Sequence, residues 1–110
     1  MKKPLTAVFL LAFGAAQAGM LMAHAACAAT HEIVMEGVAF KPQTLTVKKG
    51  DSVVWVNNDV FPHTATAADR TFDSGEIAST RKWKLVAKKS GRFPYICTLH
   101  PTMKGTLIVK

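Results

Sequence analysis

A thiol, an imidazole and a thioether lie within seven residues near the end of the chain. The segment reads Cys97-Thr98-Leu99-His100-Pro101-Thr102-Met103, so two residues separate each of these side chains from the next. Soft sulfur ligands combined with imidazole favour copper among the biological metals. The trigonal copper arrangement needs two histidines, one cysteine and a distant methionine. Any fold of this chain must therefore bring a second histidine to the segment.

His63 is the histidine best placed to complete the set. It follows a strong predicted strand and precedes a turn-rich stretch, so a sandwich of strands could bring it to Cys97 and His100. Singly, each residue has a plain structural explanation: a buried cysteine, a gap-filling methionine, a loop or turn histidine. Their joint spacing favours one copper held by His63, Cys97 and His100, with Met103 as a weak axial ligand. Such a site suits both Cu(I) and Cu(II) and predicts the transfer of single electrons.

Short strands separated by turn residues fill the rest of the chain, which predicts an all-β sandwich or barrel. Phe93, Tyr95 and Cys97 share one side of a strand, so this strand should direct the thiolate inward. Pro94 removes a ladder donor and predicts a local irregularity. Apolar alternation and turn residues place the other strands at 32–36, 44–47, 52–56, 81–87 and 104–110.

The chain resembles the cupredoxins, and among them the amicyanin-like and plastocyanin-like blue copper proteins. The resemblance rests on Gly50-Asp51, Val53-Val54-Trp55, Pro62-His63, Phe72-Asp73-Ser74-Gly75, Tyr95-Ile96-Cys97 and the segment that follows. It implies a Greek-key β-sandwich of about seven to eight strands. It also implies a single cupredoxin domain over residues 30–110 that works as an electron carrier.

The resemblance further implies a port for electrons beside His100. The corresponding apolar patch here is Phe61, Pro62, Leu99 and Pro101. The family commonly has Asn after its first histidine ligand, where it ties the two ligand loops together. This chain has Thr64 there. Residues behind the ligands orient them and tune the metal. With Thr64 in place of Asn, the two ligand loops are expected to be held together less firmly.

Residues 1–29 have the pattern of a cleaved export signal. Met1-Lys2-Lys3 precede an apolar stretch that ends in small residues, which is typical of such signals. Cleavage could follow Ala25, Ala28 or Ala29, and an uncleaved anchor is the alternative. The expected location is periplasmic or secreted.

Cys27 and His31 each allow a second interpretation. Cys27 could carry a lipid anchor, although His24 stands where such motifs usually have Leu. A cut after Ala28 would leave Ala29-Thr30-His31, an amino terminus able to chelate Cu(II). The alternative for His31 is a surface residue at the start of a strand.

The net charge of +7 falls to +5 without Lys2 and Lys3, because twelve basic residues then face seven acidic ones. This suits acidic redox partners of the cytochrome c or dehydrogenase type. The lysines form a solvated pattern with no nucleic-acid module. We expect a monomer that is not an enzyme and has no small-molecule substrate, because copper enzymes of this type need further histidines. A carrier or chaperone that delivers copper is the alternative function.

Overall fold

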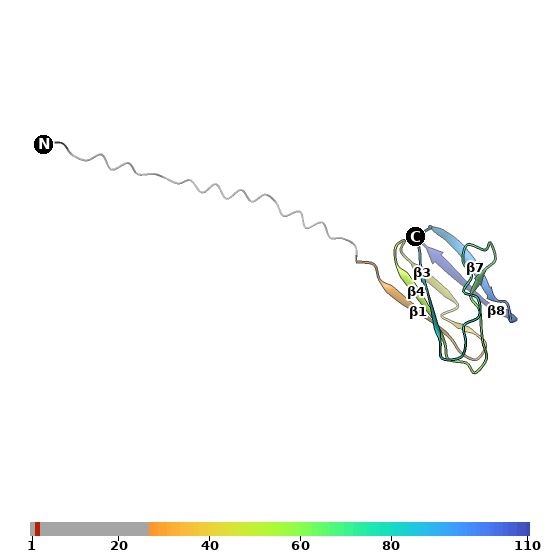
Figure 1. Cartoon of the computed structure of the whole chain (residues 1–110). Coiled ribbons are helices and arrows are strands. Elements are labelled where there is room, and N and C mark those ends of the chain that lie inside the picture. The colour runs from red at the N-terminus through yellow and green to blue at the C-terminus, as the bar shows by residue number, and fades with distance from the viewer. Residues whose placement is uncertain (1, 3–26) are drawn as a thin grey trace.

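The computed structural model describes Lys2 and residues 27–110. These residues form eight strands and no helix, in two four-stranded sheets (Figure 1). This confirms the predicted all-β sandwich of seven to eight strands. The predicted signal, residues 1–29, lies almost wholly outside the described residues.

Within the described part of the chain, no helix has the length and apolar character needed to span a membrane.

The first sheet has the strand order β2-β1-β4-β6. It comprises β1 (Thr30–Met35), β2 (Phe40–Lys41), β4 (Ser52–Asn57) and β6 (Lys82–Val86). β1 runs parallel to β4, while β2 and β6 pair antiparallel with their neighbours. The predicted strand at 52–56 is thus an inner strand, in accord with its apolar composition.

The second sheet has the order β3-β8-β7-β5. It comprises β3 (Thr44–Val47), β5 (Thr66–Ala67), β7 (Gly91–Cys97) and β8 (His100–Val109). β3 runs parallel to β8, and β7 and β8 form an antiparallel hairpin. The chain passes between the sheets repeatedly, so segments distant in sequence meet at the end where β7 turns into β8.

The core lies between the sheets and follows the two-residue period of the strands. β4 directs Val53 and Trp55 inward, and both are fully buried. The Trp55 ring lies 5.3 to 5.7 Å from the rings of Phe72, Trp83 and Tyr95. Cys97 is fully buried, as its predicted place on the inward face of β7 requires.

The hairpin at Cys97 differs from the prediction in its extent. The final strand was predicted to begin at Lys104, but β8 begins at His100, and Cys97 pairs with His100 across a turn of two residues. The short strands β2 and β5 were not predicted, because two residues are too few to show an alternating pattern.

Pro94 leaves the β7–β8 register intact, and the irregularity predicted there lies instead between Ile96 and Cys97. The Pro94 carbonyl accepts from Ala68 N–H on the side of β5. In an antiparallel strand the nitrogen of a residue points to the same side as its carbonyl. The missing donor of Pro94 therefore faces Ala68, just beyond the end of the two-residue edge strand β5, and the pairing of β7 with β8 is unaffected.

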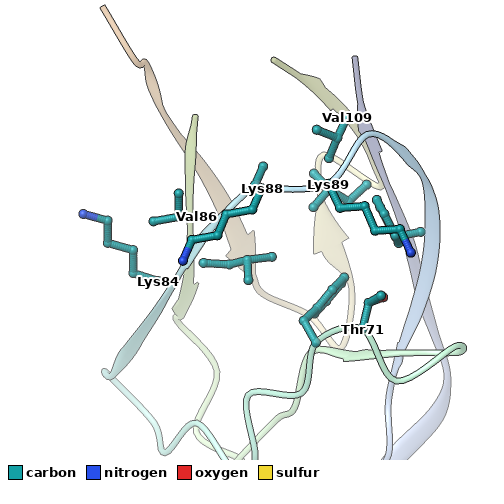
Figure 2. Close-up of a pocket in the computed structure, with 11 residues that line it drawn as sticks. Thr71, Lys84, Val86, Lys88, Lys89 and Val109 are labelled. Atoms are coloured by element: carbon teal, nitrogen blue, oxygen red, sulfur yellow. The ribbon is translucent and has the colours of Figure 1, made fainter. Parts of the chain in front are cut away.

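An open groove of about 470 Å³ runs between the edge of β6 and the second sheet (Figure 2). Leu85, Phe72 and Phe93 contribute apolar surface, and the figure shows Lys84, Lys88 and Lys89 around it. None of the four predicted copper ligands lines this groove.

Candidate metal centre

Three predicted ligands converge where the hairpin closes. Cys97 ends β7 and His100 begins β8, so the turn at Thr98-Leu99 fixes their separation. His63 reaches them from the segment between β4 and β5. Its backbone exchanges two hydrogen bonds with Ile77, with N···O distances of 2.7 and 3.1 Å. Strand pairing thus fixes the backbone at all three residues.

The atoms of these residues are spaced as metal ligands should be. Cys97 Sγ lies 3.6 Å from His63 Nδ1 and 3.8 Å from His100 Nδ1, and the three ligating atoms all lie within 4.8 Å of one another. Metal–nitrogen and metal–sulfur bonds of about 2.1 and 2.3 Å, at angles between tetrahedral and trigonal, require N···S separations of about 3.6 to 3.8 Å. Both N···S distances therefore match those expected for a single ion bound to Cys97 and the two histidines.

Met103 lies three residues after His100 on β8 and is 2% exposed. Cys97 and His63 are fully buried, whereas His100 is half-buried. A thioether, a thiolate and two imidazoles form a soft donor set that fits copper better than calcium or magnesium, which prefer oxygen ligands.

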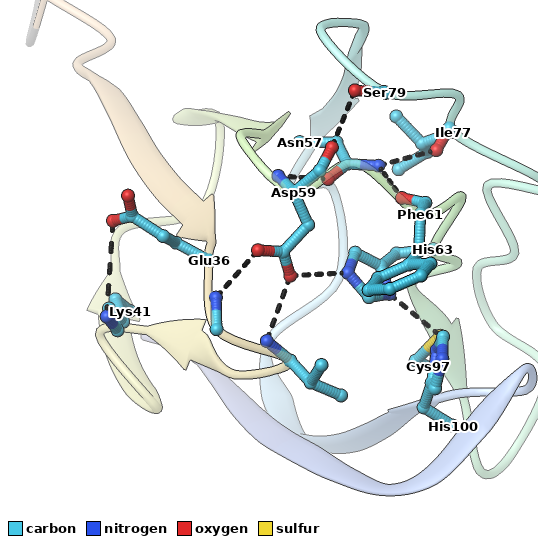
Figure 3. Close-up of polar contacts among 12 residues, drawn as sticks. Glu36, Lys41, Asn57, Asp59, Phe61, His63, Ile77, Ser79, Cys97 and His100 are labelled. Atoms are coloured by element: carbon cyan, nitrogen blue, oxygen red, sulfur yellow. Dashed lines mark hydrogen bonds and ion pairs between the residues drawn. The ribbon is translucent and has the colours of Figure 1, made fainter.

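Asp59 belongs to the site and was not predicted. Its Oδ2 lies 2.7 Å from His63 Nε2, and its two carboxylate oxygens accept from Gly37 and Val38 N–H (Figure 3). Because His63 Nδ1 faces the thiol, the Nε2 proton is donated to Asp59. Such carboxylate–histidine pairs fix ring orientation and raise ligand basicity.

The charge on Asp59 is stabilised by its donors. Burial disfavours ionisation, but the hydrogen bonds from Val38, His63 and Gly37 outweigh it and hold the pKa of the Asp59 carboxyl below its usual value. The carboxylate therefore remains an acceptor for His63 at neutral pH.

Asn57 shapes the loop that leads to His63. It is fully buried, and its side-chain amide donates to the carbonyls of Phe61 and Ile77 at 2.7 and 2.9 Å. Its Oδ1 accepts from Asp59 N–H at 2.9 Å. In the sequence, Asn57-Asn58-Asp59 are typical of a turn that ends a strand. Side chains that stabilise a turn and side chains that support a ligand have the same sequence pattern.

Thr64 ties the two ligand loops together despite replacing the family's Asn. Its N–H donates to Cys97 Sγ at 3.3 Å, and its hydroxyl accepts from Thr98 N–H at 2.8 Å. The looseness that the Thr substitution suggested is therefore not seen. A hydroxyl suffices because the turn after Cys97 brings Thr98 close.

The Thr64 hydroxyl is part of a chain of hydroxyl groups that ends at a carboxylate. Thr66 Oγ1 donates to Asp73 Oδ1 at 3.1 Å, and Thr64 Oγ1 lies 3.1 Å from both Thr66 Oγ1 and Thr98 Oγ1. Each hydroxyl has one proton. Because the Thr66 proton goes to Asp73, Thr64 must donate to Thr66 and Thr98 to Thr64. Asp73 therefore orients the whole chain.

The four residues of the predicted patch, Phe61, Pro62, Leu99 and Pro101, are all exposed. The Phe61 ring centroid lies 6.2 Å from that of His100. Val60, next to Phe61, is 81% exposed and adds apolar surface that was not predicted.

His31 is not part of the cluster. His31 lies at the start of β1 and is half-buried. Its Nε2 lies 2.9 Å from Asp51 Oδ2. The predicted surface histidine is thus partly enclosed and paired with a carboxylate.

Comparison with known proteins gives a consistent result. The family model of the cupredoxin-like domain matches residues 4–109. The chain is 28% identical to amicyanin-alpha of Methylorubrum extorquens, over 91% of this chain and 98% of that protein. It is 31% identical to the chloroplastic plastocyanin of Tetradesmus obliquus, over 90% and 79%. It is 27% identical to amicyanin of Paracoccus versutus, over 69% of this chain, and spans 61% of that protein.

Solved structures show the same fold. A mutant amicyanin in its Cu(I) form superposes with a TM-score of 0.69 at 23% identity, over 74% of this chain and 82% of that one. A copper-containing nitrite reductase from Thermus scotoductus also superposes with a TM-score of 0.69, at 29% identity. In that case 74% of this chain is covered, but only 22% of the reductase chain. The fold therefore also occurs within a larger enzyme.

Proposed function

The chain belongs to the cupredoxin-like family, and from this premise we propose that it is an exported blue copper protein that carries single electrons between redox proteins. The observation that carries the proposal is the placement of His63 Nδ1 and His100 Nδ1 at 3.6 and 3.8 Å from Cys97 Sγ. We assign His63, Cys97, His100 and Met103 as ligands of one copper. Copper, when bound, supplies the couple between Cu(I) and Cu(II).

The protein's own part is to keep its ligands still. Strand pairing holds Cys97 and His100, the bonds to Ile77 hold the His63 backbone, and Asp59 holds the His63 ring. Ligands that do not move between the two oxidation states keep the reorganisation small, which favours fast transfer.

His100 is the proposed exit for the electron. It is the one half-buried member of the three, and Phe61, Pro62, Leu99 and Pro101 surround it with exposed apolar surface. Redox partners meet over small, short-lived interfaces. The basic surface would speed encounter with an acidic partner, in the manner expected of a cytochrome c or dehydrogenase type.

We place the chain with carriers rather than with enzymes. In the described part of the chain, one cluster has the histidine and cysteine spacing of a metal site. The nitrite reductase likeness extends over only 22% of that protein. Delivery of copper to another exported protein is the competing role for the same ligands.

The visible spectrum of the Cu(II)-loaded protein tests the proposal. A strong thiolate-to-copper band near about 600 nm is expected from a trigonal site of this type. Cys97→Ser should abolish the band, whereas Asp69→Asn, on an exposed turn, should leave it intact. Copper binding without the band in a His31→Gln variant, which lacks the imidazole near the amino terminus, would contradict the proposed site. Rapid loss of copper to a chelator would instead favour the delivery role.

A further inference from the structure

Asp51, on the turn between β3 and β4, binds the start of the sandwich by its carboxylate. Its Oδ1 accepts from Ala29 N–H at 2.9 Å, and its Oδ2 accepts from Lys48 N–H at 3.0 Å and lies 2.9 Å from His31 Nε2. Asp51 is only 5% exposed. One largely buried carboxylate thus contacts the backbone nitrogens of Ala29 and Lys48 and the ring of His31.

Ala29 is also held through its carbonyl, which accepts from Ser52 N–H at 2.9 Å. Both backbone groups of this residue are thus bound to the sandwich, one residue before β1 begins. Cys27 and Ala28 are exposed and lie outside any strand. Among residues 27–110, the hydrogen bonds to the sandwich therefore begin at Ala29.

We propose that the mature protein begins at Ala29 and that its new terminal ammonium forms an ion pair with Asp51. The inference rests on the proposed export, which supplies the peptidase that removes export signals. Hydrolysis breaks the bond between the Ala28 carbonyl carbon and the Ala29 nitrogen. The hydroxyl of water makes Ala28 a carboxylic acid, and the other hydrogen of water goes to the Ala29 nitrogen to give an amine. The acid then releases its proton to solvent and the amine takes one up, which leaves a carboxylate on Ala28 and an ammonium on Ala29.

The residues around this bond suit such a peptidase, which selects small side chains one and three positions before the cut. Ala28 and Ala26 occupy those positions. A cut after Ala29 would remove the residue that makes both hydrogen bonds. A cut after Ala25 would place the ammonium on Ala26, three residues before the Ala29 nitrogen that contacts Asp51. Only the cut after Ala28 turns the hydrogen bond already present into a charge-assisted one, which is the stronger kind.

The mature mass is the direct test. The full chain should be expressed in a bacterium that exports it, purified from the periplasm and weighed intact. We expect the mass of residues 29–110. The mass of a chain that begins at Ala26 or Thr30, or of one with a lipid on Cys27, would overturn the inference while leaving export intact. Recovery of only the full-length chain in the cytoplasm would overturn the export proposal as well.

A pH series tests the ion pair separately. The pairing should raise the pKa of the terminal ammonium above its ordinary value of about 7.7 to 8.0. Stability from the pair is then complete below that value and is lost as pH rises through the raised pKa. Histidine ordinarily titrates at about 6.5 and lysine at about 10.4, outside the window from about pH 7.5 to 9.5. A cysteine thiol ordinarily titrates at about 8.5, inside the window, but Cys97 is common to every variant compared. The elements packed against Asp51 carry these titratable residues besides it: His31, Glu32, Lys48, Lys49, Lys82, Lys84, Lys88 and Lys110.

The urea midpoint of the processed protein should therefore fall as the pH rises from about 7.5 to about 9.5. Asp51→Asn should lower the midpoint at all pH values and make the fall smaller, because a neutral amide can accept a hydrogen bond from the ammonium but cannot form an ion pair with it. Asp69→Asn is the matched control, since Asp69 bonds only to Thr71 on an exposed turn, and it should retain the fall. The same pH dependence in Asp51→Asn and the wild type would overturn the ion pair.

Discussion

Asp59 is the residue whose role the structure reveals most directly, because it sets the orientation of His63. Asp59→Asn keeps the size of the side chain but removes the charge that favours the Nε2 proton of His63. Loss of such a partner typically weakens metal binding by about 10 to 100-fold. We expect a loss of this size in copper affinity, measured by competition with a chelator. Asp69→Asn should leave the affinity unchanged, and an unaltered affinity in Asp59→Asn would contradict the assigned role.

Thr64 is the second residue with a testable role. Thr64→Val preserves the shape of the side chain and the N–H bond to Cys97 but removes the acceptor of Thr98 N–H. The loss should lower the free energy of unfolding by about 1 to 3 kcal/mol and shift the thiolate-to-copper band, because the turn after Cys97 is released.

Urea unfolding and the visible spectrum measure the two effects of Thr64→Val. Thr71→Val is the control, since its hydroxyl serves an exposed turn. A change in stability with an unshifted band would show that Thr64 supports the fold but not the metal centre.

Among the elements, β7 and β8 are packed so closely that one position admits only glycine. Gly105 is paired with Tyr95 across the hairpin, and a Cβ at Gly105 would lie 2.4 Å from the Tyr95 ring and hydroxyl. Gly105→Ala should therefore cost about 1 to 3 kcal/mol of stability, as overpacking does. Urea unfolding measures this cost. The exposed neighbour substitution Lys104→Ala should change stability by less than about 0.5 kcal/mol, and equal effects of the two would refute the clash.

The sequence was a good guide where the relevant spacing is local. Cys97, His100 and Met103 lie within one segment, and the period-two pattern around Trp55 and Tyr95 reflects burial directly. The role of Asp59 could not be read in the same way, because it depends on Gly37 and Val38 being folded against it from another part of the chain. The start of β8 at His100 was missed for a related reason: pairing across the turn determines it, and the residues Pro101 and Thr102 show no strand pattern.

At the scale of the whole molecule, Tyr95 reports on the integrity of the core. It is the single tyrosine of the chain, and burial raises the pKa of its phenol to about 12. The unfolded chain ionises near pH 10, so stability is complete below that pH and is lost as pH rises toward 12. Phenolate absorbance should therefore appear near pH 12 in the folded protein and near pH 10 in urea. Appearance near pH 10 in both would show that the ring is accessible to water.

The surface around His100 offers a test of how the molecule meets its partners. Leu99→Lys introduces a charge into the proposed patch and should slow electron exchange between oxidised and reduced copies by about tenfold through repulsion. Val86→Lys adds the same charge on β6, where Val86 is 41% exposed against 44% for Leu99, and should have little effect. Magnetic resonance line broadening measures the exchange rate. Equal slowing by the two variants would place the contact elsewhere on the surface.

The full burial of Cys97 has a consequence under the proposed export. Oxidising compartments convert accessible thiols into mixed disulfides or sulfenic acids, and such attack requires contact with the sulfur. Cys97 is 0% exposed, and a chain that starts at Ala29 no longer contains Cys27. The mature protein would thus offer no sulfur nucleophile to its surroundings, and it could persist there without a reductase to regenerate it.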